Sequence, residues 1–432
     1  MSFFQNLLSS IMERSLLKSS YFRSKDFGIL HEDINKALES VMSKSGEISS
    51  LVFAEHLSSL IEALNDEEFI EFFETLHAKY DLDAEALLRA SNEYSKNKTQ
   101  KNLELIFQAS EPQWVKLFKR LNTVSEGTLR LVRLRERIRS LKQASPSLEF
   151  FDRSLLKLFK HWFNPSFLVL ESIDWSTPAN ILEKIIAYEA VHEINSWDDL
   201  RARLAPDDRK CFAFFHPLMP NEPLIFVEVA LSNKIPNTIN EIITIDRSVT
   251  LNQDINTAVF YSISNCQEGL SGISFGNFLI KQVANDLNLE FKNLKKFVTL
   301  SPVPGLRKWI SDKHPKFAKS LERLKRPEQF LKVHDNMMEY VGKYFLSSER
   351  TDKMPNDPVA RFHLGNGASL EQINYLGDLS SNGIKLSAGL MVNYLYDLDK
   401  VEKNHELYTS EKKINISKNA KKVLLKYTKE TL

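Results

Sequence analysis

"YSISNCQEGLSGISFGNFLIKQVANDL", residues 261–287, is the stretch that decides the fold class. Its first residues continue a run of β-branched and aromatic side chains that is typical of a strand ending near Cys266. Gly269 and Gly272 then indicate a turn. From about Ser274 the apolar residues recur every three or four positions, which predicts a helix. A strand that passes through a glycine turn into a helix is typical of domains that mix strands and helices.

The rest of the second half repeats this mixture. Strand-like runs occupy residues 211–216, 224–231, 239–245, 257–264, 295–301 and 389–398. They are rich in Val, Ile, Phe and Tyr, which are the residue types enriched in strands. A helix is predicted at about 274–292, between two of these runs. We therefore expect an α/β or α+β domain over residues 165–432.

The first 164 residues differ from the second half in glycine content and in hydrophobic periodicity. They contain three of the chain's 13 glycines, whereas the other ten all lie between residues 269 and 389. In "LRLVRLRERIRSLK", residues 129–142, the apolar side chains fall on one helical face and the arginines on the other. This pattern predicts an all-helical domain over residues 1–164. Its opening 25 residues are basic and rich in hydroxyl groups, as in a transit peptide, but they contain Glu13 and fit a first amphipathic helix better.

The composition argues against several classes of protein. The 432 residues carry a net charge of +1 at pH 7, so no global field attracts nucleic acid or an anionic membrane. No apolar run approaches the length of a membrane span. The two cysteines, Cys211 and Cys266, supply neither a disulfide framework nor a metal cluster, and they fit a reducing compartment. We expect a cytoplasmic protein with no metal and no nucleic-acid or membrane partner.

The glycine turn at residues 269–272 combines two features of an anion site. Glycine lets a phosphate approach the backbone closely. The N-terminus of the following helix presents N–H groups and the positive end of the helix dipole. Pyrophosphate would satisfy both features. Similar turns are also common where nothing binds, and this one is not a P-loop because no GK[ST] follows.

"TLSPVPG", residues 299–305, restricts one hydroxyl group. Alternation along the preceding strand places Thr299 and Ser301 on one face and Leu300 on the other. Pro302 fixes its own φ and confines Ser301 to extended geometry. A serine held this firmly is either a chemical reagent or the polar end of a strand, and this stretch alone favours the strand end.

"RFHLGNG", residues 361–367, places His363 beside two closely spaced glycines, which none of the other nine histidines has. A lone histidine is more often structural than catalytic. Nearby candidates for supporting groups are the amide of Asn366 and the phenols of Tyr394 and Tyr396. A helix is expected after the second glycine.

Taken in order, these stretches resemble the malonyl-CoA decarboxylases. The resemblance is carried by "FYSISNCQEGLSGISFGNFLIKQV", "TLSPVPG", "RFHLGNGASLEQINYLGDLS" and "GLMVNYLY". Weaker similarity covers most of residues 166–398. The first part resembles the family in being helical, but it carries no shared sequence motif. The resemblance implies an α+β protein. In it an oligomer-forming helical domain, residues 1–164, precedes a catalytic domain of the acetyltransferase-like (GNAT) fold, residues 165–432.

The resemblance also implies a site. Family members carry a catalytic serine in an SP-x-PG motif and a catalytic histidine in an H-L-x-N-G-A motif, which correspond to Ser301 and His363. Malonyl-CoA is implied to bind along Gly269, Ser271, Gly272, Ile273, Ser274, Phe275, Gly276 and Asn277. Two departures limit the transfer. "QEGLSG" does not meet the acetyltransferase phosphate pattern Q/R-x-x-G-x-G/A in strict spacing, and Ser274 stands where some relatives have a glutamate.

The implied reaction suits these residue types. Loss of CO2 from a malonyl thioester leaves an enolate, so the substrate is its own electron sink and no cofactor is expected. Ser301 is expected to position the carboxylate and to accept or share a proton as CO2 departs. His363 is expected to titrate near neutrality and to protonate the carbanion, which yields acetyl-CoA. A homodimer or tetramer is implied by the resemblance.

Two other functions remain open at this point. An acyltransferase would use the same CoA cleft together with an acceptor amine or alcohol. A non-catalytic helical oligomer would use the pocket to sense the level of acyl-CoA. The first alternative predicts acyl transfer without CO2 release, and the second predicts CoA binding without turnover.

Overall fold

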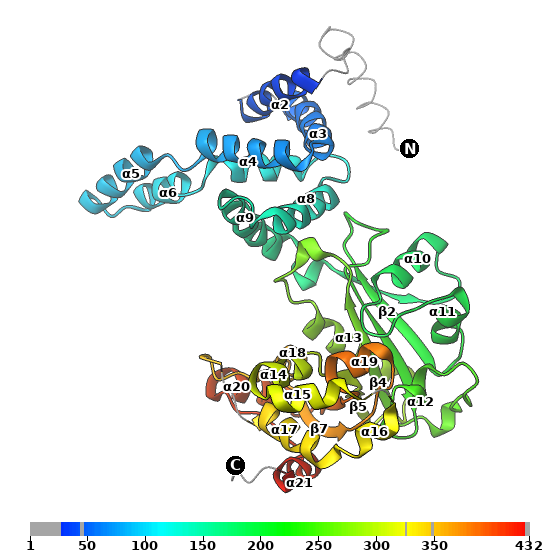
Figure 1. The fold of residues 1–432 in the computed structure, drawn as a ribbon. Coiled ribbons are helices and arrows are strands. Elements are labelled where there is room, and N and C mark those ends of the chain that lie inside the picture. Colours follow the sequence, from blue (N-terminus) through cyan, green and yellow to red (C-terminus); the bar gives the residue numbers. More distant parts are fainter. Residues whose placement is uncertain (1–26, 44–46, 325, 347–349, 428–432) are drawn as a thin grey trace. The chain divides into compact units, whose positions relative to one another are not determined.

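The computed structural model describes residues 27–43, 47–324, 326–346 and 350–427 (Figure 1). The helix expected in the opening 25 residues lies outside these ranges. The chain forms two compact units. The first, here called the helical unit, is the chain up to Phe167 together with Pro217–Met219 and Gln267–Ile273. The second, here called the sheet unit, consists of the remaining residues.

The helical unit is built from amphipathic helices. Its described helices are α2 (Phe27–Met42), α3 (Glu47–Ala63), α4 (Asp66–Tyr80), α5 (Ala84–Lys96), α6 (Gln100–Ala109), α7 (Gln113–Leu121), α8 (Gly127–Leu141) and α9 (Ser147–Trp162), with 3-10 turns η1 (Pro165–Phe167) and η3 (Glu268–Leu270). Asn65 caps α4, because its side chain accepts the Glu68 N–H while the Glu68 carboxylate accepts the Asn65 N–H. Buried rings such as Phe73 and Phe151, 4.8 Å apart, fill the interior. The expected helical first part is confirmed.

The sheet unit is organised around one eight-stranded mixed sheet. Its strands are β1 (Val169–Ile173), β2 (Arg209–Phe215), β3 (Ile225–Ser232), β4 (Thr257–Asn265), β5 (Lys296–Thr299), β6 (Ser301–Pro302), β7 (Ser369–Asn374) and β8 (Met391–Tyr396). The order is β1-β2-β3-β4-β5-β8-β6, and β7 also pairs with β8. Only β4 and β5 are parallel among these pairs, and helix α13 (Gly276–Glu290) connects them. This strand–turn–helix–strand segment is the one expected from the sequence, and the α+β class is confirmed.

The pairing of β3 with β4 contains a bulge. Glu228 pairs with Ser262, but Val229 pairs with Phe260, so Tyr261 is the extra residue on β4. A bulge bends its strand and changes the direction of the side chains around it. Tyr261 lies in the middle of the sheet, so the bulge changes the direction of side chains at the floor of the candidate site.

Helices cover both faces of the sheet (Figure 1). On one face, α10 (Ala179–Tyr188) and α11 (Trp197–Leu204) bury Ile185 and Leu200 in a cluster that includes Phe215. Phe214 faces the opposite way, and its ring stacks on Phe278 of α13 with centroids 5.7 Å apart. None of the helices in the described part of the chain is long and apolar enough to cross a membrane.

The other described helices of the sheet unit follow the strands. They are α12 (Asn240–Ile243), α14 (Leu306–Lys313), α15 (Pro315–Glu322), α16 (Pro327–Leu331), α17 (His334–Leu346), α18 (Pro358–Gly365), α19 (Ser381–Ser387), α20 (Val401–Glu411) and α21 (Lys418–Tyr427), with a 3-10 turn η2 (Asn252–Asp254). Two of these positions differ from the sequence prediction. Residues 239–245 were expected to form a strand and instead contain α12. The segment after Gly367 was expected to form a helix and instead contains β7.

Tertiary packing explains both differences. Ile239 and Ile242 lie three positions apart and bury together in one core cluster, which favours a helical turn over alternation. The β7 segment pairs antiparallel with β8, and this partner lies some twenty positions away in sequence. Local composition carries no information about such distant partners.

Candidate active site

Ser301 and His363 come together although 62 positions separate them. Ser301 lies on β6, where it pairs with Val392 of β8. His363 lies in the last turn of α18. The Oγ of Ser301 and the Nε2 of His363 are 3.1 Å apart, and both side chains are buried. The structure therefore unites the two candidates that the sequence analysis placed first.

A chain of hydrogen bonds extends from this pair on both sides. Ser301 Oγ–H donates to Thr299 Oγ1 at 2.9 Å, which confirms that the two hydroxyls share one face of the strand. Because a hydroxyl has a single proton, His363 Nε2–H then donates to Ser301. His363 Nδ1 is left as an acceptor, and the phenol of Tyr396 donates to it over 2.9 Å. This arrangement favours the histidine tautomer with its proton on Nε2.

The imidazole is neutral over the physiological pH range. Burial lowers the pKa of His363 from 6.5 to about 3. The expectation that this histidine titrates near neutrality is therefore wrong. Sequence could not reveal the difference, because the shift arises from desolvation by residues distant in the chain.

Both tyrosine candidates contact the histidine, and Asn366 interacts with Tyr396. The Tyr394 ring stacks on the imidazole with centroids 4.8 Å apart and planes inclined by 25°. Burial raises the pKa of the Tyr396 phenol above its usual range, while the amide of Asn366 opposes the shift. Burial likewise raises the pKa of Tyr394 well above its usual range. The two phenols therefore remain protonated near neutrality, and Tyr396 is able to act as a hydrogen-bond donor.

Asp357 connects the serine turn to the histidine helix. One oxygen of its carboxylate accepts the Val359 and Ala360 N–H groups and thereby caps α18. The other oxygen accepts the N–H of Gly305, at the end of the "TLSPVPG" stretch, over 3.4 Å. Burial raises its pKa from the ordinary value. The sequence analysis missed Asp357, although an Asp–Pro pair before a helix is a recognisable start signal.

A cavity of about 270 Å³ opens beside the pair. Ser301 and His363 both line it, and the walls around them include Phe260, Phe362 and Val359. These walls are apolar, so a negative charge bound there would be poorly solvated. Phe260, Phe362 and Val359 were not expected from the sequence, because apolar residues of this kind carry no motif.

The implied malonyl-CoA residues are divided between the two units. Gly269, Ser271, Gly272 and Ile273 belong to the helical unit, Ser274, Phe275 and Gly276 belong to the sheet unit, and the side chain of Asn277 lies outside the described ones. In the sheet unit, the Gly276 backbone packs so closely on Phe362 that a methyl group there would overlap the ring. Gly276 therefore adjoins a wall of the cavity.

The glycine turn offers fewer free N–H groups than the sequence suggested. Leu270, Ser271 and Ile273 all donate their N–H groups to carbonyls within the turn. At the start of α13, in contrast, no described side chain caps the helix. Among the described residues of the turn, Gly272 keeps its N–H for a ligand, and the further backbone donors for an anion lie at the helix start.

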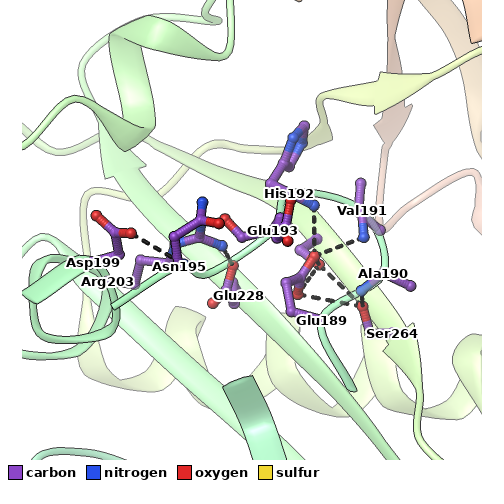
Figure 2. A network of polar contacts seen from close by, with 11 residues as sticks. Glu189, Ala190, Val191, His192, Glu193, Asn195, Asp199, Arg203, Glu228 and Ser264 are labelled. Carbon is purple, nitrogen blue, oxygen red and sulfur yellow. Dashed lines mark hydrogen bonds and ion pairs between the residues drawn. The ribbon is translucent and has the colours of Figure 1, made fainter. Parts of the chain in front are cut away.

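A second polar cluster lies in the sheet unit (Figure 2). The Glu189 carboxylate accepts the His192 N–H and the Ser262 hydroxyl, each at 2.7 Å. Nearby, Arg203 donates to Glu228 at 3.1 Å. Burial raises the pKa of Glu228 to about 7 despite the arginine, and burial lowers the pKa of His192 to about 4. The cluster is only partly satisfied internally, because His192 Nε2, Glu228 Oε1 and the Tyr261 hydroxyl are buried without a hydrogen-bond partner in the described part of the chain.

Comparison with known proteins agrees with this geometry. The model of the malonyl-CoA decarboxylase C-terminal domain matches residues 166–432, and that of the N-terminal domain matches residues 80–163. Mitochondrial malonyl-CoA decarboxylase of the goose Anser anser anser is 34% identical over 71% of this chain and 68% of its own length.

Solved structures of similar sequence have the same fold. The crystal structure of malonyl-CoA decarboxylase from Agrobacterium vitis is 43% identical, with a TM-score of 0.86 over 91% of this chain and 99% of that one. The one from Rhodopseudomonas palustris is 41% identical, with a TM-score of 0.85 over 90% of this chain and 99% of that one. Because both domain models match in the expected order, the chain belongs to the malonyl-CoA decarboxylase family.

Proposed function

We propose that this enzyme converts malonyl-CoA to acetyl-CoA and CO2 by the paired action of Ser301 and His363. The observation that carries the proposal is the 3.1 Å contact between Ser301 Oγ and His363 Nε2 on the wall of an apolar cavity. The malonyl group occupies that cavity. Its thioester carbonyl receives the electrons of the breaking bond as an enolate.

Ser301 holds the carboxylate. In the substrate-free arrangement its hydroxyl donates to Thr299, and a malonyl carboxylate replaces Thr299 as the acceptor. An ionised carboxylate has no proton to give, so the serine acts as a hydrogen-bond donor that aims the breaking bond out of the thioester plane. Apolar walls such as Phe260 leave the carboxylate charge poorly solvated, and this charge leaves the carboxyl group when CO2 forms.

The neutral state of His363 favours the same step. An imidazolium beside the carboxylate would form an ion pair and stabilise the substrate more than the transition state. With its pKa near 3, His363 presents an uncharged Nε2–H instead. The α-carbon of a thioester enolate is a stronger base than the imidazolate that remains, so this N–H is acidic enough to protonate it. The hydrogen bond from Tyr396 to Nδ1 stabilises the imidazolate, and a proton from solvent restores Nε2–H before the next turnover.

The CoA part extends along Gly269 and residues 271–277. Support comes from the uncapped start of α13, whose backbone donors and dipole suit a pyrophosphate. The acyl end then points toward the cavity that Phe362 lines, next to Gly276.

A turnover assay tests the proposed function. The purified full chain is incubated with malonyl-CoA, and CO2 and acetyl-CoA are measured together. We expect equimolar products, and we expect Ser301→Ala and His363→Ala each to lower kcat by about 100- to 10,000-fold. The matched controls are Ser387→Ala, at a buried serine of α19, and His161→Ala, at an exposed histidine of α9.

Other outcomes discriminate the alternatives. Wild-type kcat in the Ser301→Ala variant contradicts the proposed mechanism. Acyl transfer to an acceptor without CO2 favours an acyltransferase, and acetyl-CoA binding without turnover favours a sensor.

We also propose that the helical unit forms the homo-oligomer. Helices α5 and α6 pack on each other as a hairpin (Figure 1). Among their described residues, Leu88, Leu105 and Phe107 are exposed. The exposed fractions of Leu88 and Phe107 are both 63%. A second copy of the chain would cover these side chains. We place the enzyme in the cytoplasm, on the basis of its low cysteine content.

A further inference from the structure

Arg135 of α8 is the most deeply buried cation of the helical unit's described part, with 1% of its surface exposed. Its Nε donates to Asp152 of α9 at 2.8 Å, which balances the charge. Its Nη1 donates to two backbone carbonyls, those of Gly269 at 2.7 Å and Ser271 at 2.9 Å. A buried charge is retained only when it is paired and hydrogen-bonded, and here two of the three hydrogen bonds go to the segment Gln267–Ile273.

The rest of the contact is equally close. A methyl group at Gly269 would overlap the backbone carbonyl of Val132 on α8, so only glycine fits there. Arg139, one turn along the same helix, donates to the Ser271 hydroxyl at 3.1 Å. The conformation of this segment is therefore set by α8.

The bond to the Ser271 carbonyl has a directional consequence. In a trans peptide the C=O and N–H point in opposite directions. Because Arg135 draws the Ser271 carbonyl toward α8, the N–H of the next residue, Gly272, points away from α8. Gly272 is exposed and has a φ of +90°, a conformation that glycine adopts without strain. Its N–H is thus presented to ligands on the open side of the turn.

We propose that Arg135 is a positioning residue for the nucleotide end of acyl-CoA. It touches no substrate. It acts through the Ser271 carbonyl, which aims the Gly272 N–H at the pyrophosphate. The inference rests on the proposed function insofar as that function places CoA along this segment. It assigns a binding role to a helix of the unit otherwise expected only to form oligomers.

The test compares two substrates in the full-length enzyme. Malonyl-CoA carries the pyrophosphate, and malonyl-pantetheine lacks it. We expect Arg135→Gln to raise the KM for malonyl-CoA and the Kd for acetyl-CoA by about ten- to hundredfold, with kcat at saturation within about twofold of wild type. The kcat/KM for malonyl-pantetheine should stay within about twofold.

Arg137 provides the matched control on the same helix. It makes the same kind of contacts, with the Leu64 carbonyl and the Asp66 carboxylate, each at 2.8 Å, but none of these groups belongs to the segment 267–273. Arg137→Gln should leave both substrates' constants unchanged. Arg135→Lys retains a cation for Asp152 but lacks the Nη1 group that donates to both carbonyls. It replaces Arg135→Gln if the glutamine variant does not fold.

The outcomes separate this inference from the proposed function. A folded Arg135 variant with wild-type affinity for acetyl-CoA overturns the inference, and so does an equal loss with both substrates. Failure of the wild-type enzyme to release CO2 while it binds acetyl-CoA overturns the proposed function and leaves the role of Arg135 standing.

Discussion

Tyr396 determines which nitrogen of His363 carries the proton. Its phenol lies 2.9 Å from Nδ1, and burial keeps it protonated. With Nδ1 occupied as an acceptor, Nε2 carries the hydrogen and faces Ser301. In the proposed mechanism, this one hydroxyl prepares the histidine for proton donation.

Tyr396→Phe should lower kcat while leaving the fold intact. Without the phenol, a buried Nδ1 has lost its donor, and the other tautomer, which cannot donate from Nε2, becomes populated. Leaving a buried group unpaired costs about 1–3 kcal/mol, so we expect kcat to fall by about five- to 150-fold. Tyr375→Phe removes a phenol that bonds the Phe330 carbonyl and serves as the control. Steady-state kinetics with an unchanged kcat for Tyr396→Phe would contradict the tautomer argument.

The depressed pKa of His363 predicts how stability depends on pH. Its folded value of about 3 lies below the unfolded value of 6.5, so the unfolded chain binds more protons between these values. The contribution to stability is fully present above pH 6.5 and is lost as pH falls toward 3. Glu228 has the opposite sign, because its pKa is raised from 4.5 to about 7 and its contribution is lost as pH rises through that range.

The corresponding experiment measures urea unfolding at pH 5.0, 5.5 and 6.0. His363→Asn should reduce the dependence of the unfolding free energy on pH by about 1.4 kcal/mol per pH unit. His161→Asn, at an exposed position of α9, should leave the dependence unchanged. A slope equal to wild type in His363→Asn would mean that the imidazole is not neutral in the folded state.

At the scale of elements, two helices meet where the cavity forms. The start of α13 and the last turns of α18 touch through Gly276 and Phe362. Asp357 then ties the start of α18 to the turn after β6 through Gly305. These contacts, rather than the strands alone, set the width of the cavity beside Ser301.

Gly276→Ala should displace the Phe362 ring and disturb this wall. Overpacking of this kind costs about 1–3 kcal/mol, so we expect a lower free energy of unfolding together with a fall in kcat/KM for malonyl-CoA. The double variant Gly276→Ala/Phe362→Leu makes room for the new methyl group and should recover much of the lost stability. Equal stability of the single and double variants in urea titrations would refute the proposed clash.

The sequence predicts those elements whose signals are local. The β4–turn–α13 segment, strand β5 and the helical first part all follow from hydrophobic periodicity and from the positions of glycine and proline. The predicted strand over residues 295–301 is interrupted, however, because β5 ends at Thr299 and Ser301 begins β6. Residues 239–245 are predicted to be a strand because the run is rich in isoleucine, yet Ile239 and Ile242 bury as a helical turn. The β7 segment depends on pairing with β8, which no local pattern encodes.

The candidate site divides in the same way. Motifs identified Ser301 and His363, and strand alternation placed Thr299 beside the serine. Desolvation of the imidazole and the roles of Phe362 and Asp357 depend on contacts between distant segments. These features could be recognised only after the chain was folded.

At the scale of the whole molecule, the α5–α6 hairpin offers a test of assembly. Leu88→Glu/Phe107→Glu places charges on the exposed apolar positions, and burying them against a second copy would be costly. We expect a smaller mass by analytical ultracentrifugation than for wild type. Lys101→Glu alters a polar position of α6 and should leave the mass unchanged. An unaltered mass in the double variant would exclude this hairpin as the interface.

The helical unit includes Gln267–Ile273, which lies about a hundred positions beyond its last helix. This has a consequence for biosynthesis. At a ribosomal rate of about 5–20 residues per second, roughly 5–20 seconds pass between emergence of Phe167 and of Ile273. During that interval the guanidinium of Arg135 has its carboxylate partner but lacks both carbonyls. The two hydrogen bonds from Arg135 to the Gly269 and Ser271 carbonyls can therefore form only after the central strands of the sheet have been translated.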